Sequence, residues 1–136
     1  MKQTVIGALL LALSFGFVAG PAEAVKTKGD NCTADGDTLY SQVYYFSEGS
    51  KWFADKATYS LSESSGDKSN VIIKLKSSRG FVYFNWSSPD NRKGGHSYKK
   101  EIDRLASKSK KPYLQIKFIP DQFGLDPNCH TKATLT

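Results

Sequence analysis

The stretch on which the expected fold depends is SYKKEIDRLA, residues 97–106. Ser97 is a suitable N-cap for a helix that begins here. Four side chains then repeat at the spacings i, i+4, i+7 and i+8 that one helix face requires: Tyr98, Ile102, Leu105 and Ala106. Pro112 follows a short lysine-rich segment and would stop the helix. The pattern therefore predicts one amphipathic helix over residues 97–106.

Much of the remaining chain alternates polar and apolar residues with the period of a β-strand. We expect strands at residues 40–47, 57–62, 71–76, 81–86, 114–118 and 131–135. In the first of these, one face carries Tyr40, Gln42, Tyr44 and Phe46. Residues 87–95 concentrate turn-forming and flexible residues, and they form the longest polar loop.

A lone helix with several strands before it and two after it permits few folds. One of them is the OB-fold, a small Greek-key barrel that binds oligosaccharides and oligonucleotides. We therefore predict a mainly β fold with one α-helix, in the form of an OB-fold-like barrel of five to six strands. The order of elements would be strands, helix, strands.

The chain begins like a secretory signal peptide. A lysine at position 2 precedes an apolar run over residues 5–19, and the small-residue pattern Ala22-Glu23-Ala24 follows. The run is shorter than the roughly 20 residues that a membrane-spanning helix needs. We expect cleavage after Ala24, which leaves residues 25–136 as a single secreted domain that would pass through the periplasm in a bacterium.

The chain has a formal net charge of +6. A basic secreted domain favours anionic partners such as sialylated glycans, lipid headgroups or nucleic acid, and charge alone does not choose among them. The basic residues are spread from Lys26 to Lys132, and residues 108–111 form the one local cluster. Dispersed lysines of this kind indicate a solvated surface rather than a binding stripe.

Two cysteines, Cys32 and Cys129, lie near the two ends of the expected mature domain. In an oxidising compartment this pair predicts one disulfide that ties the N-terminal segment to the last strand. A closed loop of this length is expected to contribute about 4–5 kcal/mol to stability in the chain-entropy account. Cys129 and His130 could form half of a metal site, but no further cysteine is present and His96 is distant in sequence.

No nucleophile motif, phosphate-binding glycine loop or zinc signature stands in this order of elements, so we expect neither enzyme activity nor a cofactor or metal. His96 and Ser97 are adjacent, whereas a catalytic base approaches its nucleophile from elsewhere in the fold. Asp30, Asp35 and Asp37 do not match the spacing of an EF-hand loop.

Several stretches resemble the B subunits of AB5 enterotoxins of the cholera and heat-labile type. The stretches are residues 59–64, 71–76, 80–84 and 97–105. The surroundings of the two cysteines, residues 30–32 and 128–130, are similar to the Shiga-type B subunit. The resemblance implies a secreted OB-fold protein that forms a homo-pentamer, binds a host cell-surface glycan and delivers a separate catalytic A subunit.

The same resemblance implies the position of the glycan site. In the cholera-type family the loop before the helix lines the sugar pocket, and here that loop spans residues 86–97. The ligand-binding residues expected on this basis are Trp86, Asn91, Arg92, Lys93 and His96 from the loop and Tyr98 from the start of the expected helix. Trp86 would offer an aromatic face, and the loop side chains would offer hydrogen bonds to sugar hydroxyls.

Two other functions fit the sequence. One is a monomeric secreted effector or inhibitor that acts by binding a protein. The other is a nucleic-acid-binding barrel that uses Tyr83, Phe84 and Trp86 as stacking platforms. Secretion argues against the second, so we expect no stable nucleic acid partner.

Overall fold

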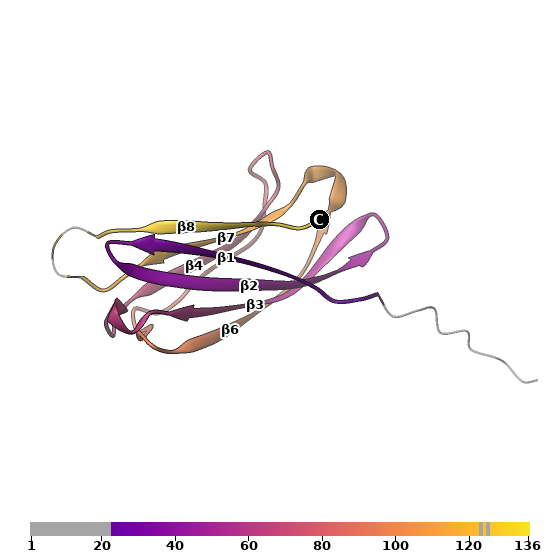
Figure 1. The fold of residues 1–136 in the computed structure, drawn as a ribbon. Coiled ribbons are helices and arrows are strands. Elements are labelled where there is room, and N and C mark those ends of the chain that lie inside the picture. Colours follow the sequence, from indigo (N-terminus) through magenta and orange to yellow (C-terminus); the bar gives the residue numbers. More distant parts are fainter. Residues whose placement is uncertain (1–22, 123, 125) are drawn as a thin grey trace, which may run out of the picture.

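The computed structural model describes residues 23–122, 124 and 126–136, and in them the chain forms a layered β structure (Figure 1). The strands are β1 (Lys26–Ala34), β2 (Asp37–Glu48), β3 (Lys51–Leu61), β4 (Asn70–Lys76), β5 (Val82–Ser87), β6 (Ser97–Ser107), β7 (Tyr113–Ile119) and β8 (Cys129–Thr134). Two short 3-10 turns are η1 (Glu63–Ser65) and η2 (Lys108–Lys110). The expected signal peptide, residues 1–24, lies outside the described residues except for its last two positions.

The strands form two antiparallel four-stranded sheets. We call the first, with strand order β1-β2-β3-β6, the front sheet, and the second, with order β5-β4-β7-β8, the back sheet. The mainly β class is confirmed. The two sheets of the described residues do not close into a barrel, and the OB-fold is not confirmed. No helix in the described part of the chain is long and apolar enough to cross a membrane.

The predicted helix over residues 97–106 is wrong, because this stretch is strand β6. It pairs antiparallel with β3 along most of its length, from Ser60↔Ser97 to Lys51↔Ser107. The hydrogen bonds and side-chain packing of this pairing outweigh the weak local preference for a helix. The order strands, helix, strands is therefore also wrong.

The side-chain pattern of β6 is compatible with both a helix and a strand. Tyr98, Ile102 and Ala106 are spaced by four, which suits both one face of a helix and one face of a strand. Leu105 distinguishes the helix from the strand, because a helix would bury its side chain, whereas in β6 the side chain is 40% exposed. Asp103, with φ of 48°, lies in a bulge where β6 carries more residues than β3.

The expected strands are confirmed as β2, β3, β4, β5, β7 and β8, several of them longer than predicted. Strand β1 was not expected from the sequence, since KTKGDNCTA has no apolar alternation. It is an edge strand of the front sheet, and Ala34 is its one fully buried side chain. An edge strand with few side chains in the core carries little hydrophobic periodicity.

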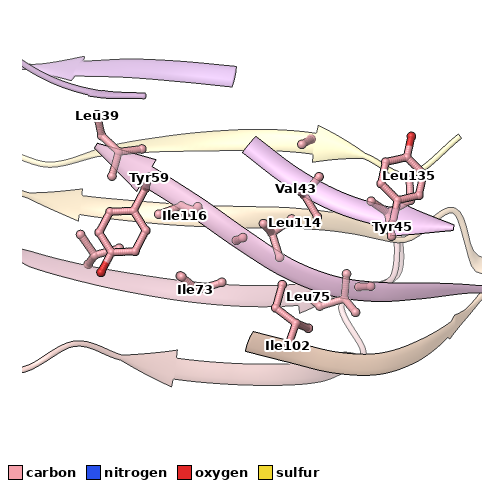
Figure 2. Packing of buried hydrophobic residues seen from close by; sticks show 14 of the residues in the cluster. Leu39, Val43, Tyr45, Tyr59, Ile73, Leu75, Ile102, Leu114, Ile116 and Leu135 are labelled. Carbon is pink, nitrogen blue, oxygen red and sulfur yellow. The ribbon is translucent and has the colours of Figure 1, made fainter. Parts of the chain in front are cut away.

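The core lies between the two sheets, where the inward side chains of both meet. Figure 2 shows Val43 of β2 and Ile102 of β6 in the same layer as Ile73, Leu75 and Leu114 of the back sheet. All five are at most 2% exposed. Burial on this scale is the main favourable contribution to folding.

The predicted disulfide is confirmed between Cys32 of β1 and Cys129 of β8, whose Cα atoms are 5.8 Å apart. It joins the edge of the front sheet to the edge of the back sheet. Beside it, the backbone N–H of Lys132 donates to Oδ2 of Asp30 at 2.7 Å. One side of the sandwich is therefore closed by a covalent bond and a charge-assisted hydrogen bond.

Candidate functional site

The outer face of the front sheet carries a row of aromatic side chains on β2. The odd-numbered residues of this strand, Val43 and Tyr45 among them, point into the core. The even-numbered residues Tyr40, Tyr44 and Phe46 therefore lie on the outside. The predicted division of this strand into two faces is correct, and the face richer in aromatic rings is the one that faces away from the core.

A shallow depression of about 260 Å³ lies beside Tyr40 on this outer face. Tyr40 is 53% exposed and pairs with Ser60 across the sheet, while Gln42 pairs with Thr58. Ser97 of β6 lies opposite Ser60 and continues the row. The depression thus brings one exposed ring together with uncharged hydroxyl and amide groups from three neighbouring strands.

Gln42 is held in place by a hydrogen bond from the Tyr44 hydroxyl to Gln42 Oε1 at 2.9 Å. This leaves the two N–H groups of the amide to donate elsewhere. Tyr44 is in turn positioned by Lys56, whose Nζ lies 5.3 Å from its ring centroid. Fixed side chains of this kind lose little conformational freedom when a ligand binds.

The far end of the same face is apolar. The rings of Phe46 and Phe53 pack 4.9 Å apart across β2 and β3. Leu105, which pairs with Phe53, extends this patch onto β6. The outer face of the front sheet therefore runs from a polar depression at Tyr40 to an apolar patch at Phe53.

The structure brings together three of the residues predicted as ligand-binding, namely Trp86, Arg92 and Tyr98. The Arg92 guanidinium lies 4.5 Å from the ring centroid of Tyr98 and 5.6 Å from that of Trp86. Lys100 Nζ also lies 5.0 Å from the Trp86 ring. These contacts link β5 to β6 on the side of the sandwich opposite the disulfide, and they cover Trp86 with the protein's own cations.

The other predicted residues lie around this cluster with their side chains exposed. The backbone N–H of Lys93 donates to the Tyr98 hydroxyl at 2.8 Å. The rings of His96 and Tyr98 are 6.5 Å apart. Asn91 is exposed, and its backbone N–H donates to the carbonyl of Pro89. Arg92 itself is anchored through paired backbone hydrogen bonds with Ser69 at 3.0 Å.

Beneath this cluster, two buried polar atoms have no hydrogen-bond partner among the described residues: the Tyr59 hydroxyl and Nε of Arg92. Tyr59 is 2% exposed and its ring stacks on that of Tyr98 at 5.3 Å. Burial raises the pKa of Tyr59 above its usual 10.0, and the positive charge of Arg92 acts against this shift. Ionisation of this hydroxyl is therefore less favourable in the folded protein than in the unfolded chain.

Replacing Tyr59 with Phe is expected to flatten the loss of stability at alkaline pH. The folded pKa is raised, so the unfolded chain loses this proton first, and stability present below about pH 10 declines as the pH rises further. Urea unfolding at pH 8 and pH 11 measures the difference. The variant should lose less free energy of unfolding between these two values than the wild type, and an equal loss would contradict the assignment.

Acidic side chains gather at the bulge between β3 and β6. One oxygen each of Asp55, Glu101 and Asp103 lies within 4.8 Å of the others. Two of the three are paired with lysines, Asp55 with Lys56 at 3.9 Å and Glu101 with Lys99 at 3.0 Å. We assign no metal to this cluster. Cys129 is bound in the disulfide and so is not a metal ligand with His130.

Comparisons of the chain with protein-family models, with curated proteins and with solved structures give no match.

Proposed function

We propose that this protein is a secreted glycan-binding protein, and that it binds through the depression beside Tyr40 on the front sheet. The observation that carries the proposal is the combination of one half-exposed aromatic ring with hydroxyl and amide groups that bear no charge. The C–H face of a sugar ring packs against an aromatic face, and its hydroxyls both donate and accept hydrogen bonds. Ser60, Thr58 and Gln42 supply the matching groups.

The depression suits a sugar better than the loop at residues 86–97 does. Trp86, which was expected to be the aromatic platform, already has Arg92 and Lys100 over its ring. A sugar would have to displace these cations. Among the described residues no cation lies over the Tyr40 ring, and its neighbours in the depression are uncharged polar side chains that leave the ring accessible.

Secretion is part of this proposal. It is supported by the signal-like N-terminal sequence and by the disulfide between Cys32 and Cys129, because disulfides persist in oxidising compartments. The AB5-type resemblance relied most on residues 97–105, which form a strand. We therefore base glycan binding on the sheet face, and the pentamer, the catalytic A subunit and the OB-fold stay predictions.

A second candidate is a secreted effector or inhibitor that binds a protein. It is favoured by the apolar end of the same face, where Phe46, Phe53 and Leu105 lie together. Leu105 is exposed and the two phenylalanine rings are partly buried, and apolar side chains that reach one surface together are typical of protein-binding sites. Loss of partner binding on replacing Phe53 with Ser, with glycan binding unchanged, would support this candidate.

Replacing Tyr40 with Ala is expected to weaken glycan binding about tenfold, because an aromatic ring at the centre of a site contributes much of its binding energy. Retention on a glycan array, followed by calorimetry with a retained glycan, measures the effect. Tyr40→Phe keeps the ring and should retain most of the affinity. Phe81→Ala serves as a matched control, since Phe81 is 65% exposed at a turn of the back sheet. Wild-type binding by Tyr40→Ala, or no glycan retained by the wild type, would overturn the proposal.

A further inference from the structure

The outer face of the back sheet is basic. Four lysines of this sheet lie on it: Lys74, Lys76, Lys117 and Lys132. The register aligns Lys74 with Gln115 and Gln115 with Lys132, and it aligns Lys117 with His130. Paired positions in neighbouring strands are about 5 Å apart, so lysines that are dispersed in the sequence share one small surface.

This charge has no counterpart within the sheet. The four strands of the back sheet contain no Asp or Glu, whereas acidic residues occur in every strand of the front sheet. Within the described residues the salt bridges are Asp55–Lys56 and Glu101–Lys99, both in the front sheet. The lysines of the back sheet therefore remain available to an external anion.

Carboxylates lie at the margins of this face, where Asp90, Asp121 and Asp126 line a pocket with Asn70 and Ile119 at one end of β4 and β7. Asp30 accepts hydrogen bonds from the backbone N–H groups of Lys132 and Asn31. At one end of β4, Asp90 accepts from Asn70 Nδ2 at 3.0 Å. Within the described residues, none of these marginal carboxylates forms a salt bridge with a lysine of the back sheet.

Two features arrange the basic groups. Tyr113 holds two of them, since Lys132 Nζ lies 4.6 Å and Lys76 Nζ 6.0 Å from its ring centroid. Between Lys74, Lys117 and His130 the surface is hollowed, with a volume of about 220 Å³. Gln115 also lines this hollow and adds an uncharged donor and acceptor.

We propose that this basic face binds a sulfated polysaccharide. Repeated anionic groups on an extended chain match lysines that are spaced across three strands. A single-stranded nucleic acid would require free rings for base stacking, and the lysines occupy the ring of Tyr113. A membrane surface would require an exposed apolar wedge among the lysines. Ile72 and Ile119 between the strands are half-buried, and the exposed Phe81 and Val82 lie at the edge of the sheet, beside Lys76 alone.

This site lies on the opposite sheet from the depression beside Tyr40, so each of the two proposals can be tested without affecting the other. The Tyr40→Ala variant should bind sulfated polysaccharide like the wild type. Conversely, loss of the basic face should leave retention of an uncharged glycan unchanged.

The test compares two triple variants of equal net charge. The first, Lys74→Gln with Lys117→Gln and Lys132→Gln, removes the basic face. The second, Lys51→Gln with Lys93→Gln and Lys110→Gln, removes three exposed lysines from elsewhere on the protein. Binding of heparin is measured by calorimetry at several salt concentrations, with dextran as the uncharged polymer and thermal unfolding as the check of folding.

The first variant should bind heparin about tenfold more weakly and with a smaller salt dependence, whereas the control should change by about twofold or less. Dextran should not bind to this face. An equal loss in the two variants would mean that net charge alone attracts heparin, and it would overturn the proposal. Tighter binding of the wild type to single-stranded DNA or to vesicles containing phosphatidylserine, at the same salt concentration, would overturn it as well.

Discussion

Replacing Cys32 and Cys129 together with Ala is expected to lower the free energy of unfolding by about 3–5 kcal/mol. The disulfide closes a sequence separation of 97 residues and joins the edges of two different sheets. Without the disulfide, the unfolded chain gains conformational freedom. In the folded protein, β1 and β8 would then be held together only by non-covalent contacts such as the hydrogen bond between Lys132 and Asp30. Urea unfolding at pH 7, followed by tryptophan fluorescence, measures the loss.

The wild type in the presence of a reducing agent is the matched control for this variant. It should show the same loss of stability, while the reducing agent should leave the double variant unchanged. A loss of less than about 1 kcal/mol would contradict the role assigned to the disulfide.

Replacing Ile102 with Ala is expected to cost about 2–5 kcal/mol, the range for removing a large aliphatic side chain from a packed core. Ile102 is 1% exposed and packs between the sheets (Figure 2). Leu105→Ala, three residues further along β6, should cost no more than about 1 kcal/mol because Leu105 is largely outside the core. Denaturant unfolding of both variants gives the comparison.

This pair of substitutions distinguishes the strand from a helix at the same residues. A helix over residues 97–106 would place Ile102 and Leu105 on one buried stripe, so both substitutions would then be costly. Similar large losses in the two variants would contradict β6 as described.

Most of the β-strands could be predicted because one face of each is buried and the other is accessible to solvent. Residues 71–76 are an example, where Val71, Ile73 and Leu75 are buried and the residues between them are not. β1 could not be predicted in this way, since an edge strand contributes few side chains to the core. Its place in the sheet depends on pairing with β2 and on the disulfide.

The helix prediction was wrong because the spacing of the apolar residues in 97–106 fits both a helix and a strand. Positions 98, 102 and 106 satisfy the periods of both structures, so periodicity could not decide between them. Lys100 and Arg104 occupy the positions between these three on the same strand face and lie over Trp86 and Phe84 of β5, so the sequence lacks the polar-apolar alternation that would have indicated a strand. What decides is the pairing with β3, a contact between distant segments that a local pattern does not contain.

The two candidate sites could likewise be predicted only in part from the sequence. The sequence predicts that Tyr40, Gln42 and Tyr44 share one face, but it does not say that this face lies outside. The larger number of aromatic rings would favour burial, and the face with Val43 and Tyr45 is the buried one. The basic face was beyond local analysis because Lys74, Lys117 and Lys132 come together only through the register of β4, β7 and β8.

The central claim is that the depression beside Tyr40 binds glycan, and amide chemical-shift mapping by NMR tests it most directly. The wild type, labelled with nitrogen-15, is titrated with a glycan that the array retains. We expect the largest shifts at Tyr40, Gln42, Thr58 and Ser60, with small changes at Arg92 and Lys93. Shifts confined to residues 86–97, or spread without focus over both sheets, would contradict the account.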